Sequence, residues 1–236
     1  EVAARMSWLM PSASVAPSAV ALRFVNLIVS GQLLNHLTYS MLRIICSVTC
    51  GSVFGVITAI LVSQSVFANR MVSPGIQMIA PVPIVVWMPF LVMAFGVGEI
   101  YKIALATIIT YLIVHTHTVQ GIYSIERDFM ELAASYEKNL LERTQHVLIP
   151  GSMREILTDM RVSLAVAWID VFVVEYSSSE AGTEGLGWFV SDARQAGRIE
   201  DEFAGVLLIA ITGFLIDSIV SIFQRRTLSW TKSTEK

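Results

Sequence analysis

Charged side chains inside apolar stretches are the residues of this sequence most able to do chemistry. Asp170 and Glu175 follow Trp168 in a segment that is otherwise mostly apolar. A carboxylate near the centre of a bilayer costs roughly 2.5–3.5 kcal/mol on insertion scales, so it faces a cavity or a charged partner. These three residues, with Trp87, are therefore our candidates for the lining of a polar path through a membrane.

Two interpretations of Asp170 remain open. Asp170 either pairs structurally with Arg161 or Arg43, or lines the path and disfavours anionic cargo. An Asp170→Asn replacement separates them, because a changed substrate preference with an intact fold supports the second. Asp217 and Arg43 are expected to be structural, as ion-pair partners or as polar residues facing a helix bundle.

Motifs that would make the chain an enzyme are missing from the sequence. A phosphate-binding P-loop ends in Gly-Lys-Ser/Thr, and none of the four lysines follows a glycine. No HExxH, GxSxG or metal-cluster spacing appears either, and His115 and His117 are expected to be packing or polar cavity residues. We predict no catalytic residue, no metal site and no cofactor, so any ATP is bound by a partner chain.

Composition indicates a bilayer as the solvent. The 236 residues are 54% hydrophobic and 15% charged, against about 25% charged in soluble domains. The formal net charge of −3 excludes a strongly basic nucleic-acid binder.

Five stretches are long and apolar enough to span a membrane, which needs roughly 20 residues. They lie at about 37–62, 76–97, 102–122, 157–178 and 203–223. The second contains Pro81, Pro83 and Pro89, and interior prolines break helix hydrogen bonds. It is either a broken span beside a transport path or a kinked packing helix.

Two further segments give smaller predictions. Cys46 and Cys50 are spaced i,i+4, which places both on one helix face, and we expect small packing residues on a buried face. Residues 18–31 predict a short amphipathic helix that ends at Gly31 and lies at a membrane surface, since it is too short to span.

Lysine and arginine predict the orientation, because they are enriched on the cytoplasmic side. The segments 63–75, 123–156 and 224–236 on one side, together with Arg161 at a span edge, carry ten of these residues, and the other side carries five. The C-terminus is therefore predicted to be cytoplasmic, with 1–35 and 179–202 outside. An even number of spans would then require a further one before Glu1. The outer stretch 177–202 either meets an external binding protein or is an ordinary solvated loop.

A polar, helix-prone segment separates the third and fourth spans. Residues 126–155 contain ten charges, and apolar residues recur at Phe129, Leu132, Ala133 and Tyr136 with helical spacing. The pattern predicts two short amphipathic helices over 126–149, with the second ending at Pro150-Gly151. Their apolar side needs burial, either against the spans or in a groove on a partner protein.

Here the sequence resembles a known family. Glu131, Ala133 and Ala134, followed by Val147, Ile149 and Pro150, match in type and spacing the EAA signature of binding-protein-dependent type I ABC importer permeases. Further stretches resemble the taurine, aliphatic sulfonate, nitrate and bicarbonate branch, in the family's order: PVPIVVWMPFLVMAFGVGE (81–99), LTDMRVSLAVAW (157–168), GLG (185–187), SDAR (191–194) and QRRTLSW (224–230).

The resemblance implies the partners and the site. ABC ATPase subunits would grip residues 126–149 as coupling helices, a second permease subunit would complete a homo- or heterodimer, and an extracytoplasmic solute-binding protein would deliver cargo to the plasma (inner) membrane. The ATPase-coupling residues it implies are Glu131, Ala133, Ala134, Tyr136, Glu137, Leu140, Ile149 and Pro150.

One position departs from the family pattern. The signature glycine falls at Glu137, where a positive φ would cost roughly 1–2 kcal/mol. Either the turn has shifted toward Asn139, or this subunit binds its ATPase less tightly, as one half of an asymmetric pair.

Together these observations predict an all-α integral membrane fold with five visible transmembrane helices and a sixth, N-terminal one missing. The expected divisions are 1–35, a periplasmic loop with an interfacial helix; 36–230, the permease domain with coupling helices at 126–149; and 231–236, a cytoplasmic tail. The alternatives are a permease for another small organic solute and an ion-coupled carrier that needs no ATPase, which would show inverted repeats and a midplane charge relay.

Overall fold

The fold is known from a computed structural model that describes residues 16–125, 142, 144, 148–178 and 184–227. Over these residues all regular secondary structure is helical. The helices are α2 (Pro17–Val29), α3 (Gln32–Ser63), α4 (Val66–Ile79), α5 (Ile84–Phe95), α6 (Glu99–Tyr123), α9 (Ile149–Ser177), α10 (Leu186–Gln195) and α11 (Ile199–Thr227). The all-α prediction is confirmed.

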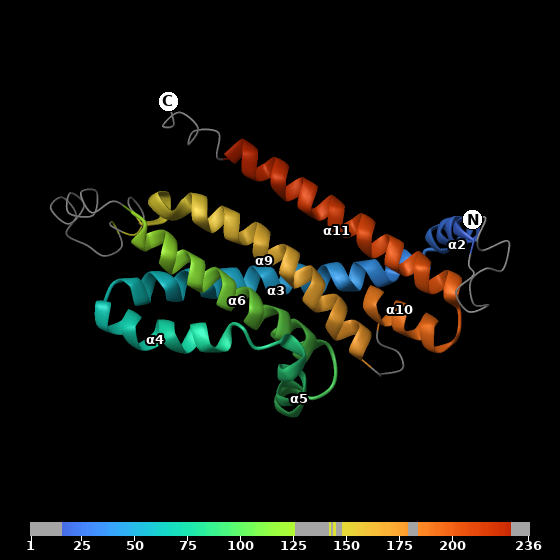
Figure 1. The fold of residues 1–236 in the computed structure, drawn as a ribbon, viewed down its shortest axis with the longest axis horizontal. Helices are drawn as coiled ribbons and strands as arrows, with labels where there is room; N and C mark the ends of the chain where they lie inside the picture. The colour runs from blue at the N-terminus through green and yellow to red at the C-terminus, as the bar shows by residue number, and fades with distance from the viewer. Residues whose placement is uncertain (1–15, 126–141, 143, 145–147, 179–183, 228–236) are drawn as a thin grey trace.

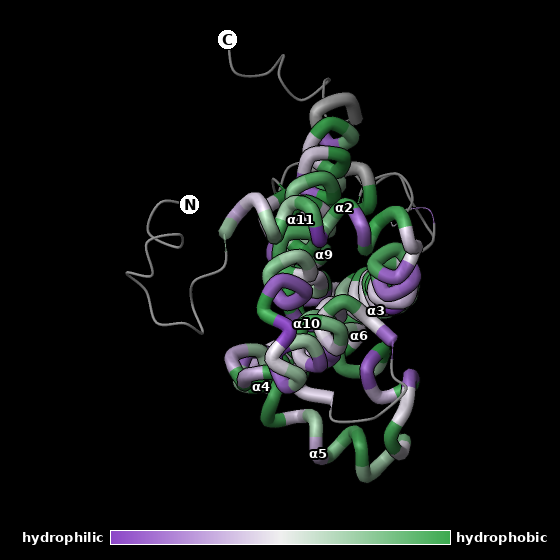
Figure 2. Tube along the Cα trace, turned by 90° about the vertical axis from the view of Figure 1, so that its right-hand side faces the viewer, coloured by the Kyte–Doolittle hydropathy of each residue, from purple (hydrophilic) through white to green (hydrophobic). Residues whose placement is uncertain are grey.

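Four long helices, α3, α6, α9 and α11, run along the long axis of an elongated bundle (Figure 1). Helix α6 packs against both α3 and α9. We call the two ends of the bundle the α10 end, where α2 and α10 lie, and the connection end, where α6 leads toward α9. Figure 2 shows hydrophobic residues over most of α5 and α11, and large side chains such as Phe214 and Ile219 are exposed there. An apolar outer surface of this kind is expected where lipid or another membrane subunit is the neighbour.

Three helices of the described chain, α3, α6 and α11, are long and apolar enough to cross a membrane. The pair α4 and α5 passes the same test jointly, which makes up to four spans. Helix α9 is 29 residues long, but Asp159, Arg161, Asp170 and Glu175 make it more polar. The predicted helices at all five positions are therefore present, while the count of five spans stays a prediction.

The three-proline stretch is a broken pair of helices. Helices α4 and α5 are bent by 104° across the break between Ile79 and Ile84, which contains Pro81 and Pro83. Pro83 precedes α5 as its N-cap residue, where a missing N–H costs nothing. The predicted single stretch 76–97 is wrong in its bounds, because α4 already begins at Val66.

Small residues let α3 approach α6 closely. Ser47, Gly51, Gly55 and Ala59 recur every four residues and are all buried. A Cβ added at Gly51 would lie 2.6 Å from the Thr110 Cβ, so the backbones pack as in small-xxx-small pairs of membrane helices.

The prediction that Cys46 and Cys50 occupy a buried face is wrong, since both are exposed. The small-residue face of α3 begins at Ser47, one residue beyond Cys46. One residue turns an α-helix by about 100°, which carries the cysteines out of the interface.

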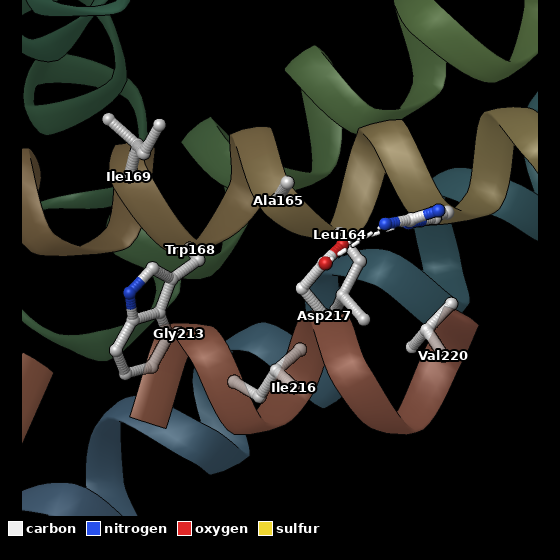
Figure 3. A pocket seen from close by; sticks show the side chains of 9 residues that line it. Leu164, Ala165, Trp168, Ile169, Gly213, Ile216, Asp217 and Val220 are labelled. Carbon is white, nitrogen blue, oxygen red and sulfur yellow. Dashed lines mark hydrogen bonds and ion pairs between the residues drawn. The ribbon is translucent and has the colours of Figure 1, made fainter. Parts of the chain in front are cut away.

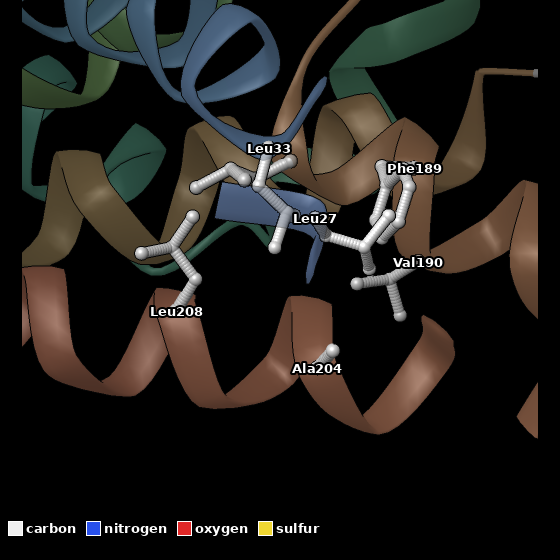
Figure 4. Close-up of a cluster of buried hydrophobic side chains, with 7 residues drawn as sticks. Leu27, Leu33, Phe189, Val190, Ala204 and Leu208 are labelled. Atoms are coloured by element: carbon white, nitrogen blue, oxygen red, sulfur yellow. The ribbon is translucent and has the colours of Figure 1, made fainter. Parts of the chain in front are cut away.

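Helix α2 confirms the predicted short apolar helix near the N-terminus, with 13 residues ending at Val29. Gly31 takes a φ of +77° before α3 begins, a conformation that favours glycine. Figure 4 shows the cluster that fixes α2 to the α10 end: Leu27, Leu33, Phe189, Val190, Ala204 and Leu208.

The expected helix end at Pro150-Gly151 is also wrong. Leu148 has helical dihedral angles, and α9 runs from Ile149 through both residues. Proline is tolerated in the first turn of a helix, because the N–H it lacks has no partner there anyway. The pair therefore lies in the first turn of α9, while the helix predicted before it falls largely outside the described residues.

Candidate functional site

A buried ionic cluster joins three long helices near the α10 end. Arg43 of α3 donates from Nε and Nη2 to the two carboxylate oxygens of Glu99, both at 2.6 Å. Its Nη1 donates to Glu175 of α9. The Arg43 and Glu175 side chains are only 2% and 1% exposed. One arginine is therefore shared by two carboxylates, one at the start of α6 and one near the end of α9.

The turn before α10 is bound to the same cluster through its backbone. The N–H of Gly185 donates to His36 Nδ1 at 3.1 Å, and that of Leu186 to Ser40 Oγ at 2.9 Å. The N–H of Gly187 donates to Glu175 Oε2 at 2.9 Å. Orphan donors at the N-terminus of α10 are thus satisfied by α3 and α9 side chains, which is how helix starts are usually capped.

Only glycine fits at two positions of this turn. Gly185 has a φ of +143°, and a Cβ there would lie 2.5 Å from Arg43 Nη1. A Cβ on Gly187 would lie 2.5 Å from the Phe172 carbonyl oxygen. The missing side chains of the GLG motif therefore let the start of α10 pack directly on the ionic cluster. Below, the Arg43 cluster means His36, Ser40, Arg43, Glu99 and Glu175.

Sequence reasoning placed Glu175 and Arg43 within spans but missed Glu99, Ser40 and His36. The signal was available: His36, Ser40, Arg43 and Ser47 are polar residues spaced by four, three and four within an apolar helix. That spacing puts them on one face, and an arginine there requires carboxylates.

Of the remaining predicted path residues, Trp168 lines a small pocket together with Ser40 and Glu175 of this cluster. Trp87 and Val173 belong to the apolar contact between α5, α6 and α9, whereas Trp168 packs toward Ile44 and Val171. Asp170 is 8% exposed. The structure does not gather Trp87, Trp168, Asp170 and Glu175 into one site, and their role in a path stays a prediction.

Asp170 is not paired with either arginine proposed for it. Arg43 is held by Glu99 and Glu175, and Arg161 by Asp217. Within the described residues the Asp170 Oδ2 atom is buried without a hydrogen-bond partner. The structural-pair interpretation of Asp170 is therefore wrong, while Arg43 and Asp217 are ion-pair partners of other residues, as expected of structural groups.

A groove between α9 and α11 has a volume of about 200 Å³ (Figure 3). Arg161 donates to Asp217 across it, from Nε at 2.8 Å and from Nη2 at 2.9 Å. The other lining residues are Leu164, Ala165, Trp168, Ile169, Gly213, Ile216 and Val220. The groove is thus apolar along its length and carries one ion pair.

Most of the predicted ATPase-coupling residues lie outside the described part of the chain: Glu131, Ala133, Ala134, Tyr136, Glu137 and Leu140. Ile149 is the first residue of α9, and Pro150 lies in its first turn. The described helix ends on either side of this segment, the end of α6 and the start of α9, lie at the connection end, away from α10 (Figure 1).

An all-helical bundle with small-residue packing, a broken span and buried ion pairs defines a polytopic membrane protein. Residues 51–229 match the family of binding-protein-dependent transport system inner membrane components. The chain belongs to this family, the permease subunits of ABC importers.

Two curated relatives place it in the sulfonate and taurine branch. A protein of Bacillus subtilis (strain 168) named as an aliphatic sulfonates transport permease, SsuC, is 32% identical over 95% of this chain and 81% of its own length. The taurine transport system permease protein TauC of Escherichia coli (strain K12) is 30% identical over 83% of this chain and 70% of its own length.

A solved structure supports the fold independently. A chain from inward-facing conformations of the MetNI methionine ABC transporter superposes with a TM-score of 0.69, covering 80% of this chain and 92% of that one at 15% identity.

Proposed function

We propose that this chain is the permease subunit of an ATP-driven importer that moves a short organosulfonate into the cytoplasm. The observation that carries the proposal is the SsuC-like relative, which aligns with nearly the whole chain. Two permease subunits would form the path, a solute-binding protein would deliver cargo at the α10 end, and an ABC ATPase would bind residues 126–149.

The arrangement of the bundle supports this division of labour. The Arg43 cluster fixes α10 to α3, α6 and α9, so a protein that presses on α10 acts on three long helices at once. The C-terminal end of α6 and the N-terminal end of α9, between which the predicted coupling helices fall in the sequence, lie at the opposite end (Figure 1). Force applied at one end can reach the other through rigid helices.

Uptake into proteoliposomes tests the proposal against an ion-coupled carrier. The permease is reconstituted with an ABC ATPase and a sulfonate-binding protein from the same organism, and uptake of butane-1-sulfonate is measured. We expect uptake that requires both ATP and the binding protein. Uptake driven by a proton or sodium gradient without ATP would instead favour the carrier.

The proposed orientation places the C-terminus in the cytoplasm and α10 outside. In a background with Cys46→Ala and Cys50→Ala, an impermeant thiol reagent added to intact cells should label Gln195→Cys and spare Ser233→Cys. Labelling of Ser233→Cys alone would show that the orientation is the opposite of the one proposed.

A further inference from the structure

The ion pair in the α9–α11 groove is not placed as a lipid-facing pair should be. The Arg161 and Asp217 side chains are 38% and 49% exposed, although they lie inside long helices. Arg161 lies near one edge of the predicted span 157–178. Charged side chains within membrane helices avoid lipid and face water, protein or a solute path.

Contacts between α9 and α11 lie at both ends of the groove. At one end Trp168 approaches α11 so closely that a Cβ on Gly213 would lie 3.0 Å from its Nε1 atom. At the other end Arg161 bridges to Asp217, and Gln224 donates to Thr158 at 2.9 Å beyond it. Between these two contacts the groove is lined by Leu164, Ala165, Ile169 and Ile216.

The chemistry of the lining selects an amphiphilic anion. Leucine, isoleucine and tryptophan side chains favour an aliphatic body, and the planar guanidinium of Arg161 matches an oxyanion through two parallel hydrogen bonds. A volume of about 200 Å³ admits a short chain and is below the 300–1,000 Å³ typical of drug-sized ligands. An alkanesulfonate has this shape and charge.

We infer that the α9–α11 groove is a cargo subsite for a short organosulfonate, with the sulfonate on Arg161 and the aliphatic body between Leu164, Trp168 and Ile216. This inference rests on the proposed function. Asp217 is the resident counter-ion, and the incoming sulfonate displaces it from Arg161. Because the displaced carboxylate competes to return, cargo is held briefly and released.

The test uses the reconstituted complex of permease, ATPase and binding protein, with butane-1-sulfonate as the probe. Ile216→Trp fills the groove, and Ile219→Trp is the matched control, since Ile219 is 65% exposed on the same helix and does not line the groove. We expect Ile216→Trp to lower uptake at least tenfold while ATPase stimulation by the loaded binding protein stays within twofold. Ile219→Trp should leave both unchanged, and Ile216→Phe serves if the tryptophan variant does not fold.

A second variant addresses the counter-ion. Asp217→Asn leaves Arg161 without its carboxylate, so the purified complex should retain butane-1-sulfonate at least fivefold longer after dilution and import it more slowly. Arg161→Gln combined with Asp217→Asn should abolish this retention without lowering the unfolding temperature.

Four results would overturn the subsite. Equal uptake by Ile216→Trp and Ile219→Trp would do so directly. A defect of Ile216→Trp that appears only in liposomes containing phosphatidylglycerol would assign the groove to lipid, and loss of the permease dimer would assign it to the second subunit. If the wild-type complex fails to import the probe, the proposed cargo class fails together with the subsite. If the wild type imports it and the groove variants behave like the control, the subsite alone fails.

Discussion

At the scale of single residues, Arg43 and Asp170 show opposite ways of burying charge. Arg43 has carboxylate partners on two other helices, and Glu175 adds hydrogen bonds from Ser40 and the Gly187 N–H. Asp170 is similarly buried, but its Oδ2 has no partner among the described residues. Removing one partner of a buried ion pair is strongly destabilising, because it leaves the other charge buried and uncompensated, as an unpaired buried carboxylate already is.

This contrast predicts opposite effects of two isosteric changes in one helix. Glu175→Gln should lower the free energy of unfolding by about 3 kcal/mol, the low end for breaking a buried pair, because Arg43 keeps Glu99. Asp170→Asn should leave stability unchanged or raise it, since it removes an unpaired carboxylate. Thermal unfolding in detergent measures both, and a larger loss for Asp170→Asn would contradict the assignment of partners.

Gly187, where the start of α10 packs against α9, gives a second prediction. Gly187→Ala should cost about 1–3 kcal/mol, as overpacking does, because the new methyl meets backbone and not a movable side chain. Gly75→Ala is the control: a Cβ there has nothing within 4 Å, and alanine favours a helix by up to about 1 kcal/mol. Equal unfolding temperatures for the two variants would show that α10 does not lie against α9.

Residue partners were the least predictable feature of the sequence. The presence of Arg43, Asp170 and Glu175 in apolar segments was visible, and so was their need for partners. Which carboxylate meets which arginine depends on helix rotation and on contacts between residues such as Arg43 and Glu175 that lie more than 100 positions apart, and no local pattern encodes that. The predicted pairing of Asp170 with Arg161 or Arg43 failed for this reason.

At the scale of elements, the α3–α6 contact depends on small residues. Gly51→Ala should cost about 1–3 kcal/mol, since its methyl would meet the Thr110 Cβ and the Thr107 carbonyl oxygen at 2.6 and 2.8 Å. Cys50→Ala, next in sequence but exposed, should change stability by no more than about 0.5 kcal/mol. The unfolding temperatures of the two variants check the interface, and a Cys50→Ala defect as large as that of Gly51→Ala would place the interface on the other face.

Helix positions followed from hydropathy, but helix faces and breaks did not. Long apolar runs gave α3, α6 and α11, because bilayer thickness and helix rise fix their length. The cysteine face was misassigned because cysteine, serine and glycine are all small, and only packing distinguishes them. Likewise, proline marked the region of the α4–α5 break without giving its 104° angle, and Pro150 was misread because proline occurs both after helix ends and in first turns.

At the scale of the whole molecule, the sequence signature was more informative than composition. Composition indicates only a membrane protein, whereas the ordered motifs indicate one family of permeases, and the family match over residues 51–229 confirms that assignment. The partners that bind each end of the subunit are separate chains. Their identity and the orientation of the subunit in the membrane are therefore proposals.

Glu137 gives a prediction for the assembled transporter. If glutamate at the signature position weakens the turn, Glu137→Gly should tighten binding of the ABC ATPase and raise coupled uptake, because glycine adopts positive φ without strain. Titration of the ATPase onto the permease in nanodiscs measures this. An unchanged dissociation constant would mean that the turn has shifted, toward Asn139.

The central claim is that residues 126–149 are the binding site through which a separate ATPase moves the helix bundle. Single cysteines placed along this segment, with Ser135→Cys the first choice, can be crosslinked in the assembled complex and compared with Gln195→Cys in α10. The account predicts crosslinks from Ser135→Cys to the ATPase that change in yield with ATP, and none from Gln195→Cys. Crosslinks to the ATPase from α10, or none from 126–149, would contradict it.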